Sequence, residues 1–381
     1  MLKLAGCAGY DSALMDVAAR VAGRRALGEP APEVSEIVAA LRAAGSPHVW
    51  PKVWTLSGHA LDPAAVEAAF VDSLADAVVL GERRCGVAVA RAKSGAEVYV
   101  AVSVDALADL SPLPSRARLG QWLALEANVL TDDTGVRVVL LGPAGAPKTV
   151  PSRLSQGAVR AVFSVDHAGL WRVQALIDGA AGPRPALEAW VFVDEPPSAA
   201  AAVLPAPGES LGSRAGGGVP VAEARRLLLD MVNLARRSEG LSPLVRDDHL
   251  DVLAQAHAEA MRRARRAAHD TGDGLPTERA ERASVSAQRI GENVARASTL
   301  GRAHRALWDS PSHRGNLLDP SFEAIGLGVA SDAVVRERSG EPPDLWVVEL
   351  FADYGTAGKA VLQRTSQPHR TTVIGIVNAV P

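Results

Sequence analysis

The sequence Gly-Glu-Asn-Val-Ala at 291–295 is followed by Trp-Asp-Ser-Pro-Ser-His-Arg-Gly-Asn-Leu-Leu at 308–318 and by Ile-Gly-Leu-Gly-Val at 325–329. The serine-proline pair at 310–311 is typical of the N-cap and first turn of a helix, which predicts a short helix carrying His313. Apolar residues alternate in 325–329, as they do in a half-buried strand. These blocks therefore predict helices and strands in alternation near the end of the chain.

Helical periodicity fills the region upstream of these blocks. One pattern runs from Val221 to Arg237, and a second begins after Asp247, which is a suitable N-cap. Asn233 lies inside the first pattern, His257 lies on the apolar face of the second, and His269 lies just past its end. Together with a third helix near 300–308 and strands at 325–329 and 345–351, this predicts an α+β domain.

In this order, the blocks and the three upstream polar residues resemble the CAP superfamily in its bacterial form. This superfamily is also called SCP or TAPS, after the cysteine-rich secretory, antigen 5 and pathogenesis-related-1 proteins. The resemblance covers residues ~221–354. It implies an α-β-α sandwich with a polar cleft, and it implies export from the cytoplasm, but it defines no single reaction because members of the family differ in activity.

The family's cleft holds two histidines and two glutamates, and the resemblance carries three of them onto His269, Glu292 and His313. The second glutamate falls on Pro311, so the fourth member is missing, and Ser310 and Asn316 are the polar residues nearby. Two imidazoles and one carboxylate suit a zinc ion with an open coordination position, with Glu292 as a ligand or as the hydrogen-bond partner of a ligand. They also suit a general base oriented by a carboxylate, or a hydrogen-bonded cluster that ties loops together.

Other polar residues of this region have structural interpretations. His257 is expected to be a buried, hydrogen-bonded core histidine. Asn233, Asn293 and Asn316 are expected to bond neighbouring loops. Ser310 and His313 are arranged like a nucleophile and its base, but no Gly-x-Ser-x-Gly turn accompanies them.

A weak internal repeat relates the N-terminal region to this domain. Asp11–Ala18 aligns with Asp247–Ala254 at an offset of 236, and Cys85–Val89 aligns with Ile325–Val329 at an offset of 240. Val21 then stands where His257 does, and no Gly-Glu-Asn block is present. We therefore predict that residues 1–108 are a degenerate, structural CAP-like domain with helices outside and a small sheet inside.

The remaining segments have distinct compositions. Residues 109–195 contain short alternating stretches separated by Gly, Pro and Asp turns, which predicts an immunoglobulin-like β-sandwich acting as a spacer. Residues 196–220 are rich in Ala, Pro, Gly and Ser, which predicts a flexible linker. Residues 355–381 form a tail with a strand-like stretch at 372–377 that has no assigned place.

Composition limits the partners and the location. The net charge of -3 gives no electrostatic footprint for nucleic acid. No apolar run approaches the ~18 residues of a transmembrane span. Leu-Ala-Gly-Cys at 4–7 has the form of a lipobox, which allows a lipid anchor at Cys7, although a signal would need an apolar stretch before it. Either the start of the sequence is trimmed or the match is chance, and a disulfide between Cys7 and Cys85 would exclude lipidation at Cys7.

These observations predict a secreted or envelope-anchored bacterial protein that binds a ligand or partner through the His269, Glu292 and His313 cleft. Candidate ligands are a divalent metal, a lipid-like molecule, a glycan, a peptide or another small molecule, and an envelope protein is a possible type of partner. A metal-assisted or protease-like hydrolase using the same cleft is the first alternative. A scaffold with a vestigial cleft is the second.

Overall fold

The computed structural model describes residues 6–30, 32, 34–74, 79–133, 135–179, 182–198, 205–332 and 344–355. The chain divides into two compact units: residues 1–205 with 308–315, and residues 206–307 with 316–381. The predicted strand-like stretch at 372–377 lies outside the described residues. In the part of the chain that is described, no helix is long and apolar enough to cross a membrane.

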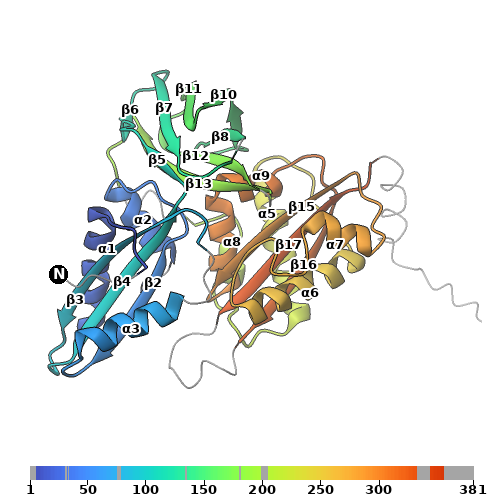
Figure 1. Ribbon diagram of the computed structural model, residues 1–381. Coiled ribbons are helices and arrows are strands. Elements are labelled where there is room, and N and C mark those ends of the chain that lie inside the picture. Colours follow the sequence, from blue (N-terminus) through green and yellow to red (C-terminus); the bar gives the residue numbers. More distant parts are fainter. Residues whose placement is uncertain are drawn as a thin grey trace, which may run out of the picture. The chain divides into compact units, whose positions relative to one another are not determined.

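The N-terminal region is a four-stranded sheet covered by helices (Figure 1), in the order β1-β3-β4-β2. Its elements are β1 (Gly9–Tyr10), α1 (Ser12–Ala26), α2 (Val34–Ala43), β2 (Lys52–Gly58), α3 (Pro63–Leu74), β3 (Glu82–Arg91) and β4 (Glu97–Ala106). Helix α1 begins where the Asp11 carboxylate accepts the backbone N–H of Leu14 at 3.0 Å. Its apolar side packs on the even-numbered valines of β4, from Val98 to Val104.

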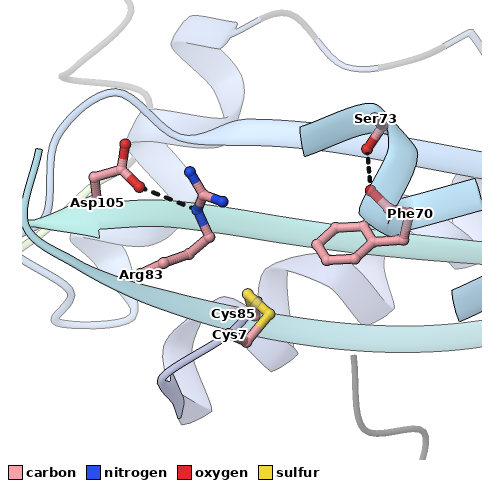
Figure 2. Close-up of a disulfide and its surroundings, with 6 residues drawn as sticks. All are labelled: Cys7, Phe70, Ser73, Arg83, Cys85 and Asp105. Atoms are coloured by element: carbon pink, nitrogen blue, oxygen red, sulfur yellow. Dashed lines mark hydrogen bonds and ion pairs between the residues drawn. A yellow bond between two sulfur atoms is a disulfide. The ribbon is translucent and has the colours of Figure 1, made fainter. Parts of the chain in front are cut away.

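The opposite face of this sheet carries a disulfide between Cys7 and Cys85 (Figure 2). It packs beside Phe70 of α3 and Ala101 of β4. Because the Cys7 sulfur is bonded to Cys85, it has no free thiol to form the thioether of a lipid anchor. The predicted lipid anchor at Cys7 is therefore wrong for the disulfide-bonded protein, since a local four-residue pattern cannot reveal a partner that is 78 residues away.

Residues 108–193 form two sheets around one shared core. Their strands are β5 (Ala108–Leu110), β6 (Arg116–Ala117), β7 (Trp122–Val129), β8 (Val136–Leu141), β9 (Lys148–Val150), β10 (Ser152–Ser155), β11 (Ala158–Ser164), β12 (Gly169–Gly179) and β13 (Gly182–Val193). One sheet has the order β10-β11-β7-β5 and the other has the order β6-β13-β12-β8-β9. Alternate residues such as Leu125, Phe163 and Val173 point into the core between the sheets.

The C-terminal region contains a second four-stranded sheet, in the order β14-β16-β17-β15. Its elements are α5 (Val221–Ser238), β14 (Val245–Arg246), α6 (Asp248–Ala264), α7 (Pro276–Arg282), β15 (Arg289–Ala297), α8 (Leu300–Asp309), α9 (Pro311–Leu317), β16 (Ala324–Ser331) and β17 (Leu345–Asp353). Helix α6 lies along this sheet (Figure 1). It packs on the even-numbered residues of the strands, among them Val294, Val348 and Leu350.

The two α/β regions share strand order and local contacts. In both sheets a short strand runs parallel to its neighbour, and the other pairings are antiparallel. The Asp11 N–H donates to the Cys85 carbonyl at 3.0 Å, and the Asp247 N–H donates to the Ile325 carbonyl at 2.9 Å. The residue pairs aligned by the sequence repeat thus occupy equivalent positions in the two sheets.

The second half of the segment predicted to be a flexible linker contains a helix and a buried ion pair. Residues 209–212 form the short helix α4, and Glu209 is buried. Its carboxylate accepts from Arg305 at 2.6 Å and from the Ala206 N–H at 2.9 Å. The stretch from Ala206 to Gly212 therefore packs on α8, because the buried Glu209 pairs with Arg305 of that helix. Composition alone could not show this pairing.

Candidate functional site

Glu292 occupies the face of β15 that points toward α6. It lies between Ile290 and Val294, which pack against the same core as α6, and its side chain is only 1% exposed. An isolated buried carboxylate would be costly, so partners must satisfy its charge. The partners come from three places: α6, the loop after it, and α7.

His269 is the first of these partners. Helix α6 ends at Arg265 in the left-handed conformation, and the chain then turns back toward β15. The Nδ1 atom of His269 lies 2.9 Å from Oε1 of Glu292, while the side chain keeps 37% of its surface exposed. The carboxylate thus fixes the orientation of a half-exposed imidazole.

Arg279 of α7 is the second partner. Its guanidinium forms a charge-assisted hydrogen bond to Oε2 of Glu292, and its side chain is 6% exposed. It also donates to the His269 carbonyl at 2.8 Å and to the Gly274 carbonyl. Arg279 therefore neutralises Glu292 and ties down the loop that carries His269. We did not identify it from the sequence, because nothing in the pattern of α7 distinguishes a buried arginine from an exposed one.

His257 of α6 is completely buried. Its Nδ1 lies 2.7 Å from the Asp273 carboxylate, its Nε2 lies 2.9 Å from the Ala268 carbonyl, and the same Nε2 lies 3.8 Å from Glu292. Burial alone would raise the pKa of Asp273, but the hydrogen bond and charge of His257, together with the Thr271 N–H and the charge of Arg279, outweigh it and lower that pKa. The prediction of a hydrogen-bonded core histidine is confirmed.

A chain of amides lies on the other face of β15. The Asn316 side chain donates to the Glu292 carbonyl at 3.2 Å and to the Asn293 side chain at 3.0 Å, and Asn293 donates to Glu349 at 3.0 Å. Asn233 exchanges two hydrogen bonds with the backbone of Leu244. The predicted bonding of a neighbouring loop is confirmed for Asn233. Asn316 bonds the backbone of strand β15 rather than a loop, and the hydrogen bonds described for Asn293 are to side chains.

The structure brings together two of the three predicted cleft residues, His269 and Glu292. His313 lies on α9, in the segment 308–315 that groups with the other compact unit. Ser310 precedes that helix, and its hydroxyl lies 3.2 Å from the hydroxyl of Ser312. The participation of His313 and Ser310 in the site stays a prediction.

The side chains around Glu292 do not fit a zinc ion that uses this carboxylate as a ligand. One carboxylate oxygen faces His269 and the other faces Arg279, and the arginine already balances the charge. Across the described ranges, no group of three or more His, Cys, Asp or Glu side chains is arranged to hold a metal ion. The arrangement supplies instead an oriented imidazole beside a neutralised carboxylate.

Comparisons with known proteins give a family match in the C-terminal part of the chain. Residues 229–350 match the model of the family described as CAP, the cysteine-rich secretory protein family. The protein YkwD of Bacillus subtilis (strain 168) is 28% identical over 130 residues, which are 34% of this chain and 51% of that protein. The chain thus aligns with about half the length of this relative.

Two solved structures are also similar in part. An outer surface protein from Borrelia burgdorferi is 24% identical, with a TM-score of 0.31, over 36% of this chain and 98% of that chain. An extracellular protein containing an SCP domain from Bacillus anthracis is 16% identical, with a TM-score of 0.31, over 64% of this chain and 88% of that chain.

Proposed function

Residues 229–350 of this chain are a CAP domain, and from that premise we propose that the chain is an extracytoplasmic bacterial protein that binds a small organic ligand at His269. The observation that carries the proposal is the pairing of a buried Glu292 with a half-exposed His269 at 2.9 Å. Nδ1 faces the carboxylate, so Nε2 is the ring nitrogen left to meet a ligand. The ordered imidazole needs no further preorganisation.

The charges around the imidazole favour an organic group over a divalent cation. Arg279 neutralises Glu292, and Asp273 is paired with His257, so little negative charge remains to attract a metal. A neutral or anionic polar group can accept or donate one hydrogen bond at His269 without displacing these pairs. The lipid-like, glycan and peptide ligands expected from the sequence all carry such a group.

The extracytoplasmic location is supported by the Cys7–Cys85 disulfide. Structural disulfides persist in oxidising compartments and are rare in the cytosol of mesophiles. Both cysteines of the chain are used in this one bond. This argument is independent of the CAP domain, because the disulfide lies in the N-terminal region.

For residues 1–108 we propose a degenerate CAP-like copy. The shared strand order, the parallel first strand and the equivalent Asp11 and Asp247 hydrogen bonds support it. Val21, at the position equivalent to His257, is buried and apolar. Without a counterpart of His257 or Glu292, this copy has a structural role.

For residues 109–195 we propose an immunoglobulin-like spacer. The two sheets β10-β11-β7-β5 and β6-β13-β12-β8-β9 correspond to the D-E-B-A and G-F-C arrangements of that fold, with an added strand at each edge of the second sheet. Its packed core, which includes Trp171, supports a compact module of the kind that a spacer requires.

A hydrolase is the second candidate, because an imidazole held by a carboxylate is also the geometry of a general base. The test compares the full chain with His269→Ala, Glu292→Gln and the control His249→Ala, which removes an exposed histidine of α6. Ligand binding is measured by NMR and native mass spectrometry. The probes are palmitate, dodecylphosphocholine, an N-acetylglucosamine oligomer, a tetrapeptide and zinc chloride.

We expect an organic probe to bind the wild type and His249→Ala, and to be lost from His269→Ala. Binding of none of these probes, or equal binding by His269→Ala, would refute the ligand site. Zinc uptake that depends on His269 and His313 would instead restore the predicted metal site. Turnover of a nitrophenyl ester or of casein that is lost in His269→Ala would favour the hydrolase.

A further inference from the structure

A cavity opens at one end of the β-sandwich, where β7 and β12 begin and β8 and β11 end. It encloses about 280 Å³. Leu140, Phe163 and Trp171 are among its lining residues and are almost fully buried. Trp122 lines it as well, yet this side chain is 70% exposed. Val162, which is 47% exposed, lines the same cavity, so two exposed apolar side chains border it.

The apolar walls of this cavity are held in place. Trp171 donates its indole N–H to the His167 carbonyl at 2.9 Å, so its ring is fixed within the core. Trp122 is the first residue of β7 and is paired in register with Ser164 of β11. A ligand that enters therefore meets an ordered wall at Trp171 and a fixed backbone at Trp122, whose exposed side chain is ordered on binding.

Two charged side chains complete the lining. Lys148 and Asp166 form an ion pair at 2.6 Å, and the other oxygen of Asp166 lies 2.8 Å from His167. The hydrogen bonds from Lys148 and His167 lower the pKa of Asp166 to about 2, so it is a carboxylate acceptor at any ordinary pH. The pair has no net charge, but it presents one strong donor and one strong acceptor next to an apolar wall.

We propose that this cavity binds a pyranose ring of a neutral β-linked oligosaccharide of the glucose or N-acetylglucosamine type. Such a ring has equatorial substituents, which leave axial C–H groups on flat faces and hydroxyls around the edge. The C–H face stacks on the electron-rich face of Trp122, and the hydroxyls reach Lys148 and Asp166. The volume lies near the lower limit of about 300 Å³ for ligand cavities, so it suits one sugar ring rather than several.

Lipid chains and apolar protein partners fit the lining less well. Each would use the apolar wall alone and would leave the Lys148 donor and the Asp166 acceptor, which are more than half exposed, without a partner in the ligand. A small ion gains nothing from a pair whose charges cancel. A sugar ring contacts the apolar wall with its C–H face and the Lys148–Asp166 pair with its hydroxyls. We therefore favour a sugar over a lipid, an apolar protein or a small ion.

The test uses the full chain and saturation-transfer NMR with chitotetraose and cellotetraose. Sorbitol is the matched negative probe, because it carries hydroxyls without a ring face. We expect transfer to the ring protons of at least one oligosaccharide and none to sorbitol. Trp122→Ala should weaken binding at least about tenfold, and Trp122→Tyr should retain most of it. The control Val89→Ala removes an exposed apolar side chain from β3 and should bind like the wild type.

Three results would overturn the proposal: no transfer to either oligosaccharide at millimolar concentration, equal affinity in Trp122→Ala, or binding that is lost in His269→Ala but kept in Trp122→Ala. The last result would place the glycan in the CAP domain and would support the proposed ligand site there. Because Trp122 is exposed, its replacement should leave the thermal unfolding of the chain unchanged, and that measurement separates lost binding from lost folding.

Discussion

The Glu292 carboxylate bonds Arg279 through one oxygen and His269 through the other, so one buried charge on β15 positions both α7 and the loop before it. Arg279 lies on α7 and His269 lies in the loop before it. The arginine also bonds the backbone of that loop at 2.8 Å. The position of the exposed imidazole thus depends on a residue that no ligand needs to touch.

Replacing Arg279 should be strongly destabilising. Arg279→Met leaves the Glu292 charge buried and without its main partner, which costs about 3–5 kcal/mol of unfolding free energy. Urea titration of the full chain measures it, and Arg263→Met is the matched control because Arg263 is exposed. The double variant Arg279→Met/Glu292→Gln should recover part of the loss. Equal stability of Arg279→Met and the control would show that the pair contributes nothing.

The disulfide gives a prediction for the N-terminal region. Cys7→Ser opens the covalent loop and leaves the buried Cys85 thiol unbonded, which should lower stability by about 2–4 kcal/mol. The loss should appear in hydrogen exchange of β3 and β4, while β16 and β17 stay protected. Alkylation of the denatured, unreduced wild type should label no cysteine. A free thiol at Cys7 would contradict the disulfide, and a fatty-acid label on Cys7 would also restore the lipid anchor.

Sequence patterns located those parts of the fold that depend on local periodicity. The helical face of α6 was predictable because burial repeats every few residues along one element. The strand β16 was predictable as a strand, but the expectation that it is half-buried was wrong, because every residue from Ala324 to Ala330 is buried. The roles of Arg279 and Cys7 were not predictable in this way, because each depends on a partner brought close by the tertiary fold. His269 and Glu292 were identified only through a family resemblance. The resemblance gives the positions of the motif residues, but it does not show which partners the two carboxylate oxygens of Glu292 bond.

Acid should weaken the C-terminal region through His304 of α8. This histidine is fully buried, its Nε2 lies 3.0 Å from the Pro207 carbonyl, and within the described residues its Nδ1 has no hydrogen-bond partner. Burial lowers the pKa of His304 to about 4, against 6.5 when unfolded. Between these values the unfolded chain binds the proton and the folded chain does not, so stability falls as the pH drops from 6.5 to 4.

The loss through His304 should reach about 3 kcal/mol at the acid end of this range. His304→Gln keeps a donor toward Pro207 but cannot take up a proton. Its urea midpoint should therefore depend less on pH than that of the wild type between pH 4 and 6.5. Parallel pH profiles for the two proteins would exclude His304 as the source.

Glu349 of β17 should have the opposite effect. It is fully buried, it accepts from Asn293 at 3.0 Å, and burial raises its pKa to about 7 despite that hydrogen bond. Between pH 4.5 and 7 the folded chain keeps the proton that the unfolded chain releases, so stability falls as the pH rises through this range. Glu349→Gln should be more stable than the wild type at pH 8, by up to about 3 kcal/mol, and similar to it at pH 4. A variant that is less stable at both pH values would contradict this account.

Two glycines test whether the two α/β regions are built alike. A Cβ at Gly86 of β3 would overlap the Leu14 backbone in α1, and a Cβ at Gly326 of β16 would overlap the Leu250 backbone in α6. The helix in each region therefore touches the strand at a position that only glycine allows. Gly86→Ala and Gly326→Ala should each separate helix from sheet and cost at least about 1–3 kcal/mol.

Each glycine substitution should act on its own region. Hydrogen exchange should rise in α1 and β3 for Gly86→Ala, and in α6 and β16 for Gly326→Ala. Gly23→Ala is the matched control, because its Cβ would meet nothing within 4 Å and it lies inside α1, where alanine is favoured over glycine by about 0.5–1 kcal/mol. If Gly86→Ala were as stable as Gly23→Ala while Gly326→Ala unfolded, the close helix contact would belong to the CAP domain alone, and the structural basis for treating residues 1–108 as its copy would be lost.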